Sequence, residues 1–147
     1  DEVLRRAQQL LEKGEGKMRV TVWRLVVLGL AVWLGACAVT RPVMNVQNSP
    51  VNASKANPTL DEIGKAIIRA GAGLGWQMSP QRPGHMEGRL ALRTHVAVVD
   101  INYDRKSYSI VYKDSTNLNY DGSNIHRNYN GWIQNLDKAI QVQLANL

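Results

Sequence analysis

The chain has 147 residues, a formal net charge of +6 and a single cysteine. One cysteine excludes an internal disulfide framework, so packing alone must stabilise the fold. The excess of basic over acidic residues would suit binding to nucleic acid or to an anionic surface. The segments described below decide between these two kinds of partner.

The first 17 residues have the pattern of a short amphipathic helix, with leucines at 4, 10 and 11. We expect Met18 to be the start of the precursor and residues 1–17 to be an upstream extension. The alternative is a cytoplasmic extension that precedes an uncleaved anchor.

Residues 18–36 have the parts of a secretory signal peptide. Arg19 and Arg24 supply the basic beginning, and the 16 residues from 25 to 40 carry no charged side chain. That run is short for a membrane-spanning helix, which needs about 20 apolar residues. The sequence therefore predicts a signal peptide over 18–36, with an uncleaved inner-membrane anchor as the alternative.

The residues Leu34-Gly35-Ala36-Cys37 resemble the lipobox of bacterial lipoproteins. The resemblance implies that Cys37 is the lipid attachment site, that the chain is cut just before it, and that acyl chains such as palmitate anchor the protein in a membrane. Because Ala38 rather than Asp follows, it also implies sorting to the cell outer membrane on the periplasmic face. The inner membrane, or a plain signal peptide cut near Ala36 or Ala38, stays open.

Residues 37–58 are rich in Asn, Ser and Pro and are expected to form a lipid-anchored tether. Weak alternation allows a short edge strand over 43–47. Pro50 and Pro58 would interrupt anything longer.

A helix is predicted over 60–70. Thr59 and Glu62 have the spacing of a capping box, and the apolar stripe is Leu60, Ile63, Ile67 and Ala70. Glycines at 71, 73 and 75 are expected to end this helix.

An antiparallel sheet is predicted next. A strand begins at 76–78, a loop follows over 79–84, and residues 85–103 form one long extended stretch. Its apolar face changes parity, which indicates a β-bulge near 97–99 or burial on both sides. A turn at 104–107 leads into a returning strand that contains Tyr108, Ile110 and Tyr112.

The last predicted elements are a polar loop over 114–124 and a helix over 129–145, capped by Asn128 or Asn130. Residues 59–147 are therefore expected to be a single α+β domain. It would have a small antiparallel sheet of three to four strands, with two helices packed on one face.

A candidate partner-binding surface lies before and inside the last helix. Aromatic rings beside an arginine make an adaptable contact surface, and its members are Tyr120, His126, Arg127, Tyr129 and Trp132. The alternative is that Tyr129 and Trp132 belong to the core. The stretch 63–147 is similar to small, uncharacterised proteobacterial lipoproteins with like Tyr-Asn-Gly-Trp segments, a resemblance that implies no particular activity.

Catalytic and metal-binding patterns are weak. Residues 117–122 resemble the front of a calcium loop, but Asn128 stands where a bidentate Glu belongs. The histidines at 85, 95 and 126 lack zinc-ligand spacing. His95 and Asp100 would face opposite sides of a regular strand. A Glu87–Asp100 dyad is possible in space, but the sequence gives no argument for it. We therefore expect no catalytic residues, no metal and no cofactor.

These patterns together predict a membrane-anchored, periplasm-facing lipoprotein with a non-enzymatic binding or structural role in the cell envelope. Its partners would be the membrane, through Cys37, and an envelope protein or polymer. Export from the cytoplasm argues against nucleic acid. The alternative is a binding module for cell-wall glycan or lipopolysaccharide, and the third possibility is a hydrolase.

Overall fold

The computed structural model describes residues 2, 5, 6, 9 and 40–147. Residues 2, 5, 6 and 9 are helical, in agreement with the helix expected there. The predicted signal peptide and Cys37 lie outside the described residues. In the part of the chain that is described, no helix combines the length and the apolar character needed to cross a membrane.

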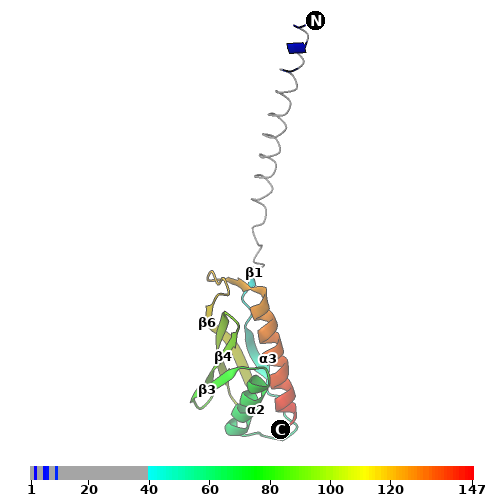
Figure 1. Ribbon diagram of the computed structural model, residues 1–147. Coiled ribbons are helices and arrows are strands. Elements are labelled where there is room, and N and C mark those ends of the chain that lie inside the picture. Colours follow the sequence, from blue (N-terminus) through cyan, green and yellow to red (C-terminus); the bar gives the residue numbers. More distant parts are fainter. Residues whose placement is uncertain (1, 3–4, 7–8, 10–39) are drawn as a thin grey trace. The chain divides into compact units, whose positions relative to one another are not determined.

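Residues 40–147 belong to one compact unit built from a sheet and two helices (Figure 1). The strands of the main sheet are antiparallel and lie in the order β2-β6-β5-β4-β3. Their bounds are Val46–Pro50 (β2), Gln77–Arg82 (β3), His85–Leu92 (β4), His95–Tyr103 (β5) and Ser107–Thr116 (β6). A second sheet pairs β1 (Thr40–Pro42) with β7 (Asn124–His126).

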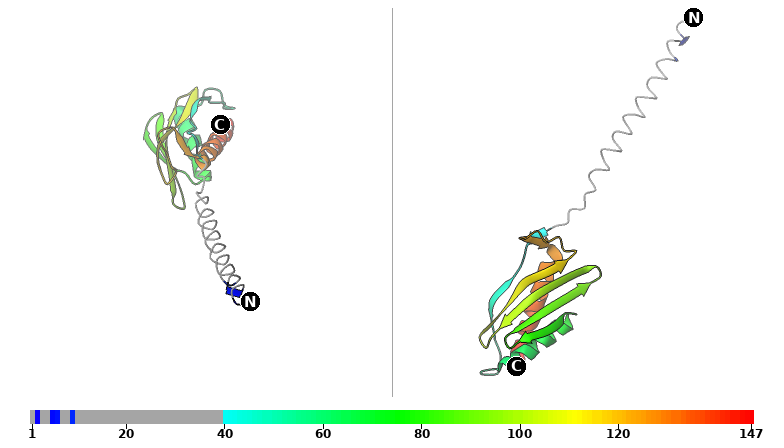
Figure 2. Two further views of the ribbon diagram at one scale, coloured as in Figure 1. Left: turned by 90° about the horizontal axis from the view of Figure 1, so that it is seen from above. Right: turned by 90° about the vertical axis from the view of Figure 1, so that its left-hand side faces the viewer.

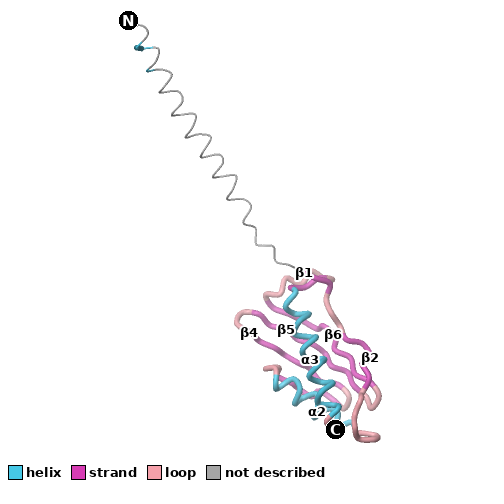
Figure 3. The backbone as a smooth tube through the Cα atoms, turned by 90° about the vertical axis from the view of Figure 1, so that its right-hand side faces the viewer, coloured by secondary structure: helices cyan, strands magenta, loops and turns pink. Residues whose placement is uncertain are grey.

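Helices α2 (Leu60–Gly73) and α3 (Arg127–Ala145) lie together on one face of the main sheet (Figure 3). The predicted α+β class is confirmed. The predicted strand number is too small, because the main sheet has five strands rather than three to four and a two-stranded sheet accompanies it.

The segment predicted to be a tether is folded from residue 40 onward. Strand β1 pairs with β7, and β2 pairs with β6. Between them, the Val43 amide donates to the Ser123 carbonyl at 2.9 Å. The reason is that apolar side chains at 43, 44, 46 and 51 pack against the core, so this Asn-rich segment buries enough surface to order itself. The expected edge strand lies at 46–50 rather than 43–47, with Pro50 as its last residue.

The capping box of α2 is present. The Thr59 hydroxyl accepts from the Glu62 amide at 3.2 Å, and the Glu62 carboxylate accepts from the Thr59 amide at 2.8 Å. The helix continues to Gly73 instead of ending at 70. Of the three glycines expected to end it, at 71, 73 and 75, only Gly75 takes a left-handed conformation, with φ +83°. Gly71 lies inside the helix, where α2 passes so close to β3 that a Cβ atom would lie 2.6 Å from the Met78 sulfur.

The long extended stretch expected over 85–103 is a hairpin. Strands β4 and β5 are joined at residues 93 and 94, and Arg93 has φ +54°. This turn explains the parity change, because even-numbered residues of β4 and odd-numbered residues of β5 face the core. A register shift does occur between Val98 and Val99, where Lys113 is the extra residue of β6, but it does not cause the parity change.

Two further boundaries differ from prediction. Strand β3 includes Pro80, within the segment expected to be a loop, because β3 is an edge strand where a missing amide hydrogen breaks no ladder. Helix α3 begins at Arg127, and its cap is His126, whose Nδ1 accepts from the Asn128 amide at 3.3 Å. Asn130 instead holds the β1–β2 link, accepting from the Met44 amide and donating to the Pro42 carbonyl.

The core lies between the helices and the inner face of the sheet. Its largest fully buried side chains are Tyr108, Tyr129, Ile63, Ile67, Met86, Ile101, Ile110, Leu118, Ile125, Ile133, Leu136 and Ile140.

The strands run between two ends of the domain (Figure 2). We call the first the β1 end; it comprises residues 40–42, 92–95 and 114–127. The second, the far end, comprises residues 51–60, 82–84 and 103–107. Strand β6 runs from the far end to the β1 end over ten residues, which places the two ends about 30 Å apart.

Candidate functional site

The structure divides the predicted partner-binding surface between the exterior and the core. Tyr120 is 40% exposed, Arg127 is exposed and His126 is half-buried, all at the β1 end. Tyr129 is fully buried, and the half-buried Trp132 packs against the core. Tyr129 is therefore a core residue, as the alternative interpretation held, and not part of a surface, because it lies on the same helix stripe as Ile133 and the other core residues of α3.

Three tyrosine rings connect this surface to the core. The Tyr112 ring lies 4.2 Å from the Tyr120 ring and 5.7 Å from the Tyr129 ring, centroid to centroid, with the second pair edge to face. The Tyr129 hydroxyl is buried and has no hydrogen-bond partner among the described residues. Burial raises the pKa of Tyr129, and the neighbouring tyrosines add to that effect. Tyr129 is therefore neutral at physiological pH.

Two histidines meet at the same end. The rings of His95 and His126 are stacked with centroids 6.0 Å apart. His95 Nδ1 donates to the Asn117 carbonyl at 2.7 Å, while the Asn117 amide group donates to the Thr94 carbonyl at 2.7 Å. With His126 capping α3, both rings serve local structure, and they fix the β4–β5 turn against the loop that follows β6.

The loop that resembles part of a calcium site uses its oxygens internally. The Asp121 carboxylate accepts from the amides of Ser123 and Asn124 at 2.9 and 2.7 Å. These bonds lower the pKa of Asp121. Over residues 40–147 and the four described before them, no three His, Cys, Asp or Glu side chains gather in a way that could hold a metal ion.

A charged network that the sequence did not predict lies on the outer face of the main sheet. Lys113 Nζ lies 2.8 Å from a Glu87 carboxylate oxygen and 3.3 Å from Asp100 Oδ1, and His85 Nε2 lies 2.9 Å from the same Asp100 oxygen. Glu87 and Asp100 are direct cross-strand partners, so Lys113 offsets their repulsion. The hydrogen bonds to Glu87 and then to Asp100 raise the pKa of Lys113.

This network could have been predicted only if the position of the β4–β5 turn had been known. Once residues 93 and 94 are known to join two strands, His85, Glu87 and Asp100 fall on one face of the sheet. His95 and Asp100, by contrast, do not meet, as predicted from their spacing.

A basic pocket lies at the far end. This cavity of about 530 Å³, here called the Lys106 pocket, is lined by Val51, Ala53, Lys55, Ala56, Asn57, Pro58, Arg105 and Lys106. Lys55 pairs with Glu62 at 2.5 Å, and Arg105 Nε donates to the Pro58 carbonyl at 3.3 Å. Lys106 makes no ion pair within the part of the chain that the structure describes.

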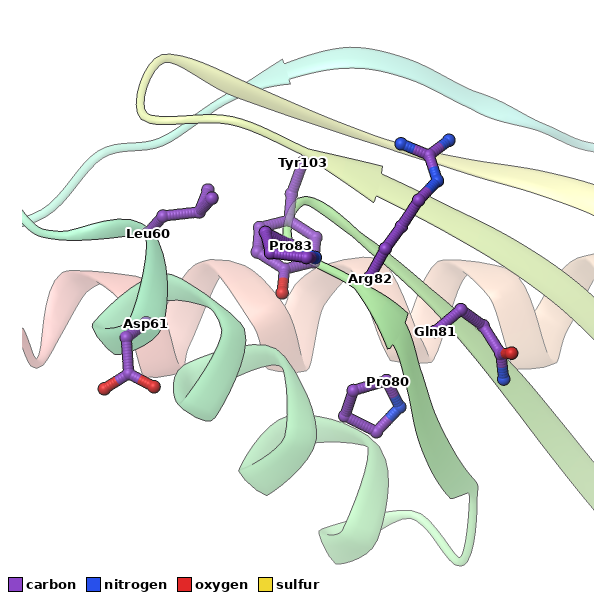
Figure 4. Close-up of a pocket in the computed structure, with 7 residues that line it drawn as sticks. All are labelled: Leu60, Asp61, Pro80, Gln81, Arg82, Pro83 and Tyr103. Carbon is purple, nitrogen blue, oxygen red and sulfur yellow. The ribbon is translucent and has the colours of Figure 1, made fainter.

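A second pocket of about 500 Å³ opens beside it, between the start of α2 and the β3–β4 turn (Figure 4). In Figure 4, the Tyr103 hydroxyl points toward α2. A Cβ atom on Gly64 would lie 2.7 Å from that hydroxyl. The pocket therefore depends on a glycine in the helix, and its rim carries Asp61 and Arg82.

Comparisons with protein-family models, curated protein sequences and solved structures gave no match.

Proposed function

We propose that this chain is the precursor of a lipoprotein, anchored through Cys37 to the outer membrane, whose folded domain faces the periplasm and binds an envelope partner. The observation that carries the proposal is the Leu34-Gly35-Ala36-Cys37 motif at the end of a run of 16 residues, 25–40, without charge. Strand β1 begins at Thr40, three residues after Cys37, so little chain separates the domain from the proposed attachment site. Anchoring in the inner membrane is the alternative location.

Binding rather than catalysis is the role that the ionisable groups support. The pairs on the outer face of the sheet, His85 with Asp100 and Lys113 with Glu87, line neither of the two pockets described above. Two further ion pairs, Lys55 with Glu62 and Lys65 with Asp61, each place one member at a pocket, but both pairs are in contact with solvent. Catalysis uses groups that are held beside a bound substrate in a site that excludes water.

A more specific role as a binding module for an anionic envelope polymer is favoured by the Lys106 pocket. Its lining includes the cations Lys55, Arg105 and Lys106 and no acidic residue. Carboxylates of cell-wall glycan, or phosphates of lipopolysaccharide, are the groups that lysine and arginine bind. The pocket lies at the end of the domain opposite β1, where the chain enters from the anchor.

Labelling with radioactive palmitate tests the anchor. Wild-type protein expressed in cells should incorporate the label and fractionate with membranes, whereas Cys37→Ala should do neither. Expression of both forms at equal levels is the control. An unlabelled wild-type protein would overturn the proposal.

Co-sedimentation with isolated peptidoglycan sacculi tests the polymer-binding role. Lys106→Glu should weaken binding, because it places an acid in the pocket. Lys138→Glu makes the same charge change at an exposed site of α3 outside the pocket and should bind like wild type. Failure of the wild type to co-sediment, with a protein captured by crosslinking in cells, would favour a protein partner instead.

A further inference from the structure

The β1 end of the domain carries an exposed apolar and basic surface. Leu92, at the β4–β5 turn, is 43% exposed, and Tyr120 is 40% exposed. The arginines at 41, 93 and 127 are also exposed at this end. Strand pairing of β1 with β7, the stacking of His95 on His126 and the bond from Asn117 to Thr94 hold these segments at one end.

The covalent chain keeps this end close to the membrane. Thr40, the first residue of β1, is three residues after Cys37. Three residues span at most about 11 Å, and the headgroup layer on each side of a bilayer is about 5–7 Å thick. An uncleaved anchor leads to the same arrangement, because the uncharged run ends at Thr40.

We propose that the β1 end rests on the bilayer, with Leu92 and Tyr120 at the headgroup boundary and the arginines at 41, 93 and 127 against anionic phospholipid headgroups. This inference rests on the proposed anchor. Tyrosine is enriched at membrane interfaces, and an apolar contact beside arginines strengthens binding to anionic lipid.

Two acidic residues, Asp121 and Asp114, lie at the same end, and their negative charges oppose part of this contact. Asp121 accepts two amide hydrogen bonds from its own loop, and Asp114 accepts one from Ser115. Three arginines against these two carboxylates give a small positive excess, so the anchor and the apolar contact contribute most of the attachment. The Lys106 pocket then faces away from the membrane, about 30 Å from the headgroups.

Site-specific quenching tests this orientation. The lipidated full protein is purified from membranes and reconstituted in vesicles of phosphatidylethanolamine and phosphatidylglycerol that contain a lipid with a nitroxide on its headgroup. A fluorophore is attached at Ser123→Cys, at the β1 end, or at Lys106→Cys, at the far end. The Cys37 sulfur is occupied by lipid, so each variant offers one thiol.

We expect most of the fluorescence to be lost at position 123 and little at position 106. Adding Leu92→Asp to the Ser123→Cys protein should reduce that loss, whereas Val142→Asp, at an exposed position of α3, should leave it unchanged.

Equal quenching at the two positions, or stronger quenching at 106, overturns the inference. The mass of the purified chain separates this failure from failure of the anchor. Absent quenching on a chain that carries acyl mass contradicts the orientation alone, and absent quenching on a chain without acyl mass contradicts both.

Discussion

Removal of the hydroxyl from two buried tyrosines should change stability in opposite directions. The Tyr129 hydroxyl has no hydrogen-bond partner among the described residues, whereas the Tyr108 hydroxyl donates to the Asp137 carboxylate at 2.6 Å. Both side chains are buried, with Tyr129 at 0% and Tyr108 at 1% exposure. Tyr129→Phe and Tyr108→Phe are therefore matched substitutions, of which only the second removes a hydrogen bond.

The magnitudes follow from what each hydroxyl does. A buried polar group without a partner costs about 1–3 kcal/mol, so Tyr129→Phe should stabilise the domain by about 1 kcal/mol. A hydrogen bond to a charged group contributes about 1.5–3 kcal/mol. Because Asp137 is half-buried and keeps its bond from Gln141 at 3.1 Å, Tyr108→Phe should destabilise by about 1.5 kcal/mol.

Urea unfolding of both variants and the wild type, followed by circular dichroism at pH 7, measures this difference. The free energies of unfolding of the two variants should differ by about 2.5 kcal/mol, with Tyr129→Phe the more stable. If Tyr129→Phe loses as much stability as Tyr108→Phe, the Tyr129 hydroxyl forms a hydrogen bond in solution and the reasoning is refuted.

Three further predictions concern the helices. The hydrogen bond from Lys55, with those from the helix cap, lowers the pKa of Glu62 from 4.5 to about 2. The ionised Glu62 should therefore stabilise the domain above pH 4.5, and this stabilisation should disappear as the pH falls toward 2. The melting temperatures of wild type and Glu62→Gln should converge over that range, and a constant difference between them would contradict the assignment. Gly131→Ala, where no atom lies within 4 Å of the new Cβ, should stabilise α3 by about 0.5–1 kcal/mol. Gly64→Ala should destabilise the domain in the same unfolding assay, because the new Cβ would displace the Tyr103 ring. Similar changes in stability for both variants would show that the clash at Gly64 is relieved. Trp132→Ala should reduce stability by about 2 kcal/mol, less than a full core truncation, and an unchanged melting temperature would make Trp132 a surface residue.

Elements with strong local chemistry could be predicted from the sequence. The capping box at Thr59 and Glu62 marked the start of α2, because two reciprocal hydrogen bonds need only that spacing. The turn after β5 was also predictable, because the Asp104 carboxylate accepts from the amides of Lys106 and Ser107.

The missed elements depend on tertiary contacts. The β4–β5 turn uses Arg93 at positive φ without glycine, and its loop is held by Asn117, more than twenty residues later. His126 caps α3 although histidine is not a usual cap, because β7 ends there after pairing with β1. The ordering of residues 40–50 likewise depends on partners that lie more than fifty residues away.

The candidate site also has parts that could be predicted from the sequence and parts that could not. Tyr120 and Arg127 could be recognised as surface residues from their composition and position, but the helical phase that buries Tyr129 was also visible and pointed to the core. The Lys106 pocket joins the segment 51–58 to the β5–β6 turn. No pattern within either segment predicts that they meet.

The central claim is that a lipid on Cys37 holds this domain at a membrane. Mass spectrometry of the protein purified from cell membranes tests it most directly. The account predicts a chain that begins at Cys37 and carries the added mass of a diacylglyceryl group on that residue. An unmodified chain, recovered from the cytosol with residues 18–36 still attached, would contradict it.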